Sequence, residues 1–509
     1  MRDLRTGVRH MTQWTRGARA VVVAICCLPV AARAGAAAQA VPPAIEAARA
    51  GDLEALRGLL EAGGDANESQ GDGATALHWA AHRDDLPSAE LLLRAGAAVN
   101  VANALGATPL WLATINGSGS MVARLLEAGA DPNVALRMGE TPLMAAARSG
   151  DLPSVRLLLE HGADVDSRER ERSQTALMWA ASQGHADVVQ LLAEYGADLH
   201  ARSEIRYQLE NTAGNTNPSA NFRMAHGGST ALLFSARNGD VRTARALVTA
   251  GADVNDTAAS GASALVVAAH SGHESLAVYL LEAGADPDAA EAGYTALHAA
   301  ILRSQVELAR ALLDRGADPD ALVTHGSPGR RFSADYSIRA QVIGVNAFWL
   351  AARYGEPDIL RMLVEHGSDP FVTPASGTTA LLAAMGMPGM GLRGATTFEN
   401  RRDRVAEVPA DPSAEERMTL ELAEIVLDAG VDIDAADERG NTALHHAVLR
   451  DFPTVVEFLS ARGANLELTN EREETPMDLA ETPQVIPGSN GLLATRPRVA
   501  ELLRQLGAQ

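Results

Sequence analysis

The chain is 509 residues long, carries a formal net charge of −21, and contains 4% aromatic residues and two cysteines. The acidic balance argues against a nucleic-acid-binding protein, because a phosphate backbone is bound by clustered positive charge and no basic stripe occurs. With few aromatic residues and abundant alanine, leucine and glycine, the composition favours thin layers of small helices over one large globular core.

The first 40 residues have the outline of a secretory signal peptide. Five arginines in residues 1–19 precede the apolar run AVVVAICCLPVAA, which begins at Ala20, and the small residues of RAGAAAQA follow. The run is shorter than the ~20 residues that a membrane-spanning helix needs, and Pro29 interrupts it. We therefore expect cleavage after Ala40 or, as the second choice, after Ala34. The mature chain would be exported, to the periplasm or the extracellular space, with no transmembrane segment.

Two alternatives remain open for this leader. Translation starts at Met1 or at Met11, since a start at Met11 gives a basic segment of more ordinary length. Cys26 and Cys27 both lie in the apolar run, so a cleaved chain would hold no disulfide and no thiolate metal site. The rival interpretation is a lipoprotein-type modification of one cysteine, although Ile25 stands where a small residue is expected. Removing the leader, which carries +5, would leave a charge of about −26.

From residue 44 to the C-terminus the chain repeats itself. Variants of TALHWAA recur, and their first residues are Thr75, Thr108, Thr141, Thr175, Thr230, Ser263, Thr295, Asn346, Thr379, Thr442 and Thr475. Seven of the ten steps are 32 to 34 residues long, and the other three are the same period with roughly 22, 18 and 30 residues inserted. A fixed period of this length indicates one solenoid of stacked units, rather than the roughly three domains that length alone suggests.

Each unit is predicted to be a helix, a turn, a second helix and an extended turn. Thr75 has the chemistry to cap a first helix, and Pro109 occupies the next position in its own unit, where a missing N–H is harmless. Apolar residues spaced three and four apart give each helix one buried face. Gly150 separates two helices and Gly162 ends the second, since glycine adopts a left-handed turn at low cost.

The pattern resembles the ankyrin repeat, and the segments TALHWAA, SGHESLAVYLLEAGADPD and GNTALHHAV are specific matches at that family's period. The resemblance implies an all-α solenoid over residues 41–509, with about eleven or twelve helix–turn–helix units and projecting β-turn or hairpin fingers. Capping units are expected at about 44–67 and 470–509. Partners of this family usually bind the concave face. The unit that begins at Asn346 lacks the capping threonine, which puts its stability in doubt.

Three insertions are not required by the stacked repeat itself. Residues 201–228 and 321–345 follow the glycine turn, where the family's fingers project, whereas about 386–414 splits the two helices of one unit. Such long loops are uncommon unless they are functional or disordered. The first two gather residue types that are typical binding anchors: Arg206, Tyr207, Phe222, Arg223, Arg330, Arg331, Phe332, Tyr336 and Arg339. The alternative is that the rings of Phe222, Phe332 and Tyr336 only pack the loops onto the solenoid.

Further candidate binding residues lie in the repeats themselves. Fingertip positions that would tune the choice of partner include Asn103, Arg137, Arg168 and Tyr294. Trp79 and Trp179 share one position of the first helix. We expect them to pack between layers with their edges reaching the concave face, where aromatic rings supply contact area.

The fourteen histidines give no catalytic or metal-binding pattern. Only His226, His325 and His446 lie outside the leader and the repeat positions, and no HExxH, GxSxG or paired HxH spacing accompanies them. We expect no enzyme activity, metal or cofactor. The sequence predicts an exported scaffold that binds a protein or peptide, as a monomer or as a subunit of a complex. The alternatives are a secreted effector that acts on a host protein and a periplasmic accessory subunit of an enzyme complex.

Overall fold

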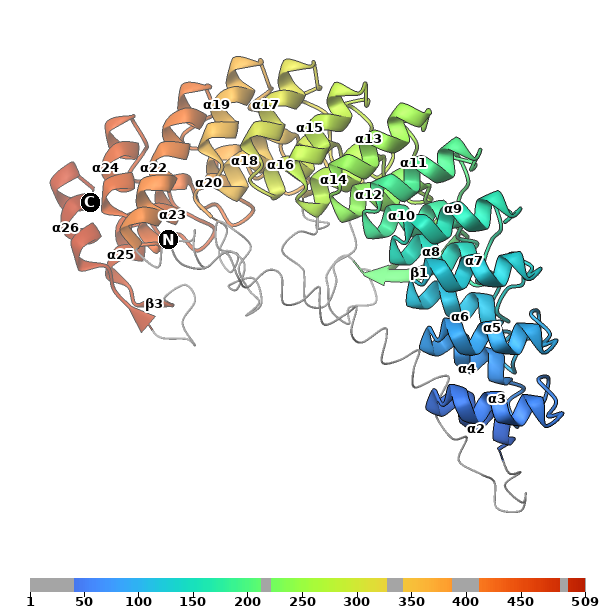
Figure 1. Cartoon of the computed structure of the whole chain (residues 1–509). Helices are drawn as coiled ribbons and strands as arrows, with labels where there is room; N and C mark the ends of the chain where they lie inside the picture. The colour runs from blue at the N-terminus through green and yellow to red at the C-terminus, as the bar shows by residue number, and fades with distance from the viewer. Residues whose placement is uncertain (1–40, 212–220, 327–341, 387–411, 486–492, 509) are drawn as a thin grey trace, which may run out of the picture. The chain divides into compact units, whose positions relative to one another are not determined.

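The computed structural model describes residues 41–211, 221–326, 342–386, 412–485 and 493–508 (Figure 1). The predicted signal peptide, residues 1–40, lies outside them. Contacts divide the chain into two compact units, Met1–Ala104 and Leu105–Gln509. The described part of the first unit contains α2 (Pro43–Ala50), α3 (Leu53–Glu61), α4 (Ala76–Arg83) and α5 (Leu86–Arg94).

The second unit continues the alternation of helix pairs and turns. Its elements are α6 (Pro109–Asn116), α7 (Gly119–Glu127), α8 (Pro142–Ser149), α9 (Leu152–Glu160), α10 (Ala176–Gln183), α11 (Ala186–Glu194), β1 (Arg206–Asn211), β2 (Asn221–His226), α12 (Ala231–Asn238), α13 (Val241–Ala250), α14 (Ala264–Ser271), α15 (Glu274–Glu282), α16 (Ala296–Leu302), α17 (Val306–Asp314), α18 (Ala347–Tyr354), α19 (Pro357–Glu365), α20 (Ala380–Ala384), α22 (Pro412–Asp428), α23 (Ala443–Leu449), α24 (Pro453–Ala461), α25 (Pro476–Glu481), β3 (Gln484–Val485), β4 (Leu493–Ala494) and α26 (Pro497–Leu506).

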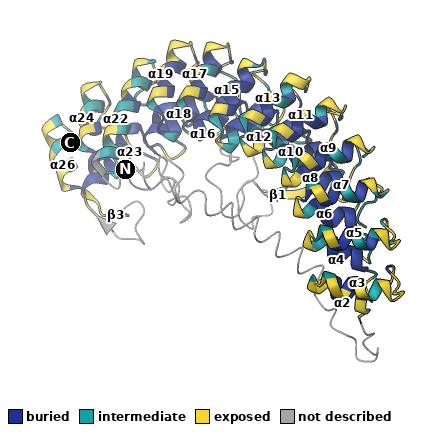
Figure 2. Ribbon diagram, viewed as in Figure 1, coloured by how far each residue is buried: buried dark blue, intermediate teal, exposed yellow. Residues whose placement is uncertain are grey.

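Within the second unit the first helices pack side by side in one row and the second helices in another (Figure 1). Buried residues lie where the two rows face each other, and the outer ends of the pairs are exposed (Figure 2). Ala146 and Ala147 on α8 have no accessible surface, because their small side chains let neighbouring helices approach closely, and Leu158 of α9 is equally buried. The predicted solenoid of helix pairs is confirmed.

The first helices begin at capped positions, as predicted. The hydroxyl of Thr108 accepts a hydrogen bond from the N–H of Trp111 at 3.2 Å. The unit at Asn346 lacks the threonine but not the cap, because asparagine caps as well as threonine does. Its Oδ1 accepts from the N–H of Trp349 at 3.1 Å, and its Nδ2 also donates to the carbonyl of Asp369 at 2.8 Å.

In three units a histidine completes the helix cap. The Nδ1 atoms of His78, His298 and His445 accept hydrogen bonds from the N–H groups of the capping threonines at 3.0, 3.0 and 3.1 Å. This bond requires a free lone pair on Nδ1, so the ring proton is on Nε2. Burial lowers the pKa of His298 to about 4, against a hydrogen bond to Ala321 and the charge of Asp318, which both raise it.

A ladder of Asn and Asp side chains joins successive units at the glycine turns. Asn133 accepts from the N–H of Asp164 at 2.8 Å and donates to the carbonyl of Gly162 at 3.0 Å. Asp288 accepts from the N–H of Asp318 at 2.7 Å. Each such bond connects one unit to the next, so the repeat's terminal turn also contributes to the interface between neighbouring units.

The first insertion, whose length predicts a loop, contains an antiparallel hairpin. Strand β1 pairs with β2, from Arg206 opposite His226 to Asn211 opposite Asn221. A second, shorter pair joins β3 and β4 near the C-terminus. These pairs add short strands to a fold that was predicted to be all-α.

The third insertion extends a second helix. Helix α22 is 17 residues long, whereas the second helix α19 of the preceding pair has nine. Glu416, near its start, accepts a hydrogen bond from the N–H of Thr454 at 2.6 Å, at the beginning of α24. The neighbouring Glu415 forms an ion pair with Arg450. Residues 387–411 lie outside the described part.

Candidate functional site

The fingers, which are the turns between a glycine turn and the next helix cap, are joined side by side in the second unit. The N–H of Arg170 donates to the carbonyl of Met138 at 2.8 Å, and the N–H of Glu204 donates to the carbonyl of Arg172 at 2.7 Å. These bonds place the fingers near residues 138 and 171 next to the base of the hairpin. The hairpin therefore stands in a row of fingers.

Arg202 fixes the base of the hairpin. Its Nη2 lies 2.6 Å from Oδ1 of Asp256, in the following finger, and its Nη1 donates to the carbonyl of Gly228 at 2.9 Å. Burial raises the pKa of the Asp256 carboxyl, and the charge of Arg202 acts in the opposite direction. The Arg202 guanidinium thus connects the beginning of the insertion with its end and with the next repeat.

One face of the hairpin is apolar and exposed. Tyr207 and Leu209 are two residues apart and therefore share a face, and 62% and 71% of their surfaces are exposed. The guanidinium of Arg223 lies 5.1 Å from the centre of the Tyr207 ring, and Arg223 pairs with Leu209 in the strand register. Figure 2 shows β1 as exposed.

On the opposite face of the hairpin, the charged side chains and His226 are engaged. Arg206 donates to the carbonyl of Glu171 and lies 4.0 Å from its carboxylate. Nε2 of His226 lies 2.9 Å from Oε1 of Glu210. Arg206, which was predicted as a binding anchor, is therefore used to hold the hairpin against the preceding finger.

Exposed apolar side chains concentrate on the hairpin and on the fingers that lead to it. Of the eleven large apolar residues that are exposed in the described ranges, five lie there: Leu105, Met138, Ile205, Tyr207 and Leu209. Single exposed apolar residues are ordinary, but a group of them marks an interaction site.

Glu169 and Glu171, in the finger next to the hairpin, have engaged carboxylates, whereas some of the arginines have none as partners. The buried Glu169 accepts hydrogen bonds from the N–H groups of Glu171 and Arg172 at 2.6 and 2.7 Å. Glu171 itself lies between Arg172 and Arg206. Among the described residues, no carboxylate lies within ion-pair distance of the exposed Arg170. The same is true of Arg137, so the fingers present free positive charge.

The predicted tryptophans lie on first helices, each beneath an arginine. In the first unit, Arg49 lies 5.3 Å from the Trp79 ring centre, and Trp79 Nε1 donates to Gln70 at 3.3 Å. In the second unit, Arg148 lies 4.7 Å from the ring centre of Trp179. Both rings are half-buried. Most of each ring is therefore used within the repeats.

The remaining predicted anchors have different surroundings. Arg168 donates to the carbonyl of Arg202 at 2.8 Å, which links two fingers. Asn103 is half-buried in the first unit. Tyr294 is not at a fingertip surface, because only 8% of it is exposed, and burial raises its pKa to about 12. The side chain of Phe222 lies outside the described part, as do residues Arg330, Arg331, Phe332, Tyr336 and Arg339.

The histidines outside repeat positions have ordinary partners. His325 is exposed, with its ring 3.0 Å from the Thr324 hydroxyl. His446 is buried, with Nε2 3.0 Å from Oδ2 of Asp437. Burial acts to raise the pKa of Asp437, but this hydrogen bond and two backbone N–H groups lower it to about 2. Within the described ranges, no three His, Cys, Asp or Glu side chains are grouped so that they could hold a metal ion.

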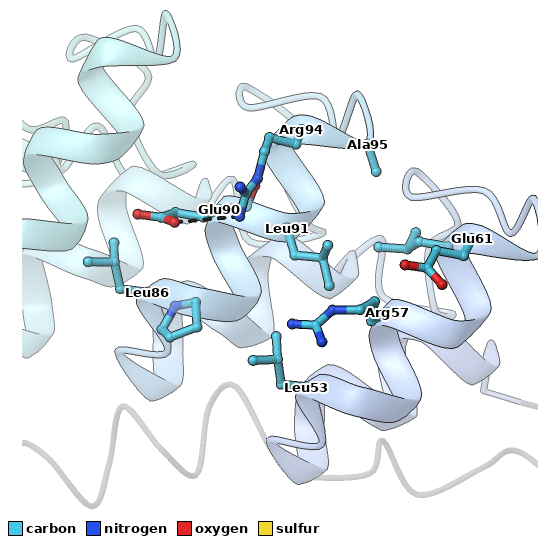
Figure 3. A pocket seen from close by; sticks show the side chains of 10 residues that line it. Leu53, Arg57, Glu61, Leu86, Glu90, Leu91, Arg94 and Ala95 are labelled. Carbon is cyan, nitrogen blue, oxygen red and sulfur yellow. Dashed lines mark hydrogen bonds and ion pairs between the residues drawn. The ribbon is translucent and has the colours of Figure 1, made fainter.

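A groove of about 570 Å³ lies between the second helices α3 and α5 of the first unit (Figure 3). Leucines such as Leu53 and Leu91 line it, together with Arg57 and Arg94. Each arginine pairs with a glutamate of its own helix, at 2.8 and 3.6 Å. Both arginines of the groove thus have a carboxylate partner, in contrast to Arg137 and Arg170 of the fingers near the hairpin.

No helix in the described ranges is long and apolar enough to cross a membrane.

Comparison with protein families gives matches along most of the repeat region. Residues 44–135, 129–203, 208–291 and 232–322 match the family described as ankyrin repeats in three copies. Residues 426–480 match ankyrin repeats in many copies, and 344–373 match a single ankyrin repeat.

Among individual proteins, human neurogenic locus notch homolog protein 1 is 32% identical over 143 residues, which is 27% of this chain and 6% of that protein. Human ankyrin repeat and SOCS box protein 6 is 30% identical over 119 residues, which is 23% of this chain and 21% of that protein. The matched stretch is thus a small part of each relative's length. The crystal structure of the human ASB11 ankyrin repeat domain is 28% identical, with a TM-score of 0.40, and covers 48% of this chain and 100% of that one.

Proposed function

The chain belongs to the ankyrin-repeat family, and from that premise we propose that it is an exported, non-enzymatic scaffold that binds a protein or peptide partner. Ankyrin repeats commonly mediate protein–protein interaction. The specific binding surface that we propose consists of the hairpin β1–β2, the fingers that lead to it and the adjoining first helices.

The observation that carries this proposal is the group of exposed apolar side chains on the hairpin. Tyr207 and Leu209 project from a segment that the repeat does not need, and Arg202 holds that segment in place. Burying them against a partner would stabilise a complex by roughly 25 cal/mol for each Å² of apolar surface removed from water.

The second insertion is proposed to contribute a further contact. Its base is held like a finger, because the N–H of Val323 donates to the carbonyl of Val345 at 2.9 Å and the N–H of Thr324 donates to that of Gly293 at 2.8 Å. Residues 327–341, which contain the predicted anchors Arg330, Phe332 and Tyr336, lie outside the described part, and their role in binding stays a prediction.

A deletion tests the scaffold function directly. Removing residues 206–226 joins Ile205 to Gly227 and restores the step from Thr175 to Thr230 from 55 residues to 34, which is the step from Thr141 to Thr175. In affinity capture from cell-envelope extract, we expect the intact mature chain to retain a defined protein and the deletion variant to retain at least about tenfold less. A variant with Val364, an exposed residue on α19 outside both the hairpin and the second insertion, changed to serine is the matched control. Equal capture by the deletion variant and the intact chain would exclude the hairpin as the binding surface.

Export is tested by the mature N-terminus. Mass spectrometry of the protein from its native source is expected to show Val41 as the first residue, or Gly35 if cleavage follows Ala34. Recovery from the periplasmic fraction would favour an accessory subunit, and recovery from the medium would favour a secreted effector. An intact leader on a cytosolic protein would contradict export.

A further inference from the structure

The surface made by Met138, Arg170, Tyr207, Leu209, Arg223 and Arg137, called here the finger patch, combines exposed apolar groups with free positive charge. We propose that the finger patch binds an acidic peptide segment in which large apolar side chains alternate with carboxylates. This inference rests on the proposed scaffold function and specifies the chemistry of the partner.

The apolar component of the finger patch lies on neighbouring structures. Met138 is 57% exposed at the tip of one finger, and the next finger is bonded to it through Arg170. Arg206 holds the hairpin against that same finger through Glu171. The finger that carries Met138, the finger that carries Arg170 and the hairpin that carries Tyr207 and Leu209 are therefore linked in one row.

The charged component is available for a partner. Arg223 stacks on Tyr207, and a stacked guanidinium keeps its N–H edge free for a carboxylate. In the described ranges, Arg137 and Arg170 have no carboxylate partner, and Glu169 and Glu171 are held by backbone N–H groups and by other arginines. Carboxylates of a partner would find the vacant donors there.

The finger patch differs in the sign of its charge from the finger before Thr475. The finger before Thr475 carries Glu467, Glu471, Glu473 and Glu474 with one arginine, and the whole chain carries −21. A nucleic acid would meet repulsion from most of this surface, whereas a short acidic segment needs to contact only the finger patch.

The spacing of groups on the hairpin favours an extended peptide. Arg223 lies opposite Leu209 in the strand register and stacks on Tyr207, so one donor adjoins two apolar side chains. An extended chain directs successive side chains to opposite sides, so residues two apart would meet the same face. A carboxylate at Arg223 and an apolar side chain beside Leu209 can thus come from one short segment.

The test uses the mature chain and a fluorescein-labelled peptide of repeated Glu-Leu-Asp-Phe units, measured by fluorescence anisotropy. We expect saturable binding that weakens as salt is raised. Peptides of repeated Gln-Leu-Asn-Phe and of repeated Glu-Ser-Asp-Ser are expected to bind at least about tenfold more weakly, because each lacks one of the two components.

Variants assign the binding to the finger patch. The double change Arg170→Gln and Arg223→Gln is expected to weaken binding at least about tenfold, and Tyr207→Ser with Leu209→Ser to do the same. The matched control is Arg310→Gln on α17, where the arginine lies 4.0 Å from Glu307 and far from the hairpin in sequence. Unchanged far-UV circular dichroism and unchanged Tm show that each variant is folded.

Several results would overturn the inference. Three concern the peptides: equal binding by the double arginine variant, equal binding of the uncharged peptide, or no saturable peptide binding. The other two are preference for duplex DNA and self-association that requires these arginines. In that last case the surface binds a second copy of the chain. If the acidic peptide fails but capture still depends on residues 206–226, only this inference falls. If capture is also independent of those residues, the proposed binding surface falls with it.

Discussion

Replacing Trp349 with alanine is expected to lower the free energy of unfolding by about 3–5 kcal/mol. The side chain is 2% exposed, so the change leaves a large cavity between first helices. It also removes the hydrogen bond from Nε1 to the carbonyl of Thr378 at 2.8 Å, which leaves a buried acceptor unpaired. The effect is large because one ring both fills the space between two units and joins them.

Urea unfolding combined with amide hydrogen exchange measures this loss. Stability in stacked repeats is approximately a sum of unit and interface contributions, so protection should fall first in α18 and α20 and last in distant helices such as α12. The control is Phe371→Ala, since this ring is exposed, and its cost is expected to be within about 0.5 kcal/mol. A similar loss from both variants would show that the buried ring does not determine the stability of this interface.

Acidification from pH 6.5 to pH 4 is expected to lower the free energy of unfolding of the second compact unit, Leu105–Gln509, by up to about 3 kcal/mol through His298 alone. Burial lowers its pKa from 6.5 to about 4. Between these values the unfolded chain binds more protons than the folded one, so the stabilisation is complete above pH 6.5 and is lost as the pH falls towards 4. Protonation also removes the Nδ1 lone pair that accepts the N–H of Thr295. The pKa of His445 is lowered in the same direction, again first by burial.

Unfolding free energies measured at several pH values between 4 and 7.5 test this expectation. His298→Asn is the informative variant, because an amide oxygen can accept the same N–H but does not titrate. We expect it to have a smaller loss of stability over this interval, and the exposed His161→Gln to behave like the unaltered chain. An unchanged pH profile in His298→Asn would rule out this histidine as the source. Asp437, with a pKa of about 2, contributes a further loss only below about pH 4.

The repeat could be predicted from sequence because its determinants are local. A capping hydroxyl at Thr108, paired alanines such as Ala146 and Ala147, and a glycine at Gly162 each act within a few residues, and their recurrence identifies the unit. Asn346 was misjudged because a cap requires an acceptor oxygen rather than threonine as such. The hairpin was missed although Ile205, Tyr207 and Leu209 alternate with polar residues, as a strand does.

The candidate site was less predictable because the availability of its side chains depends on contacts between neighbouring repeats. Arg168 and Arg206 have the composition of binding anchors, but carbonyl groups about 35 residues away along the chain engage them. Tyr294 was placed at a surface by its repeat position, whereas the fold buries it. Arg170, by contrast, was not singled out, although its free guanidinium emerges once the neighbouring carboxylates are seen to be occupied.

The attachment of Arg202 to Gly228 and Asp256 has a mechanical consequence. Tension applied at the hairpin tip would separate β1 from β2 progressively from the tip. The guanidinium of Arg202 would still hold the two ends of the insertion together at its base. The force would then act on the turn before α14, which contains Asp256, and would not simply extend the insertion. A partner pulled away from this protein would therefore strain the helix stack itself.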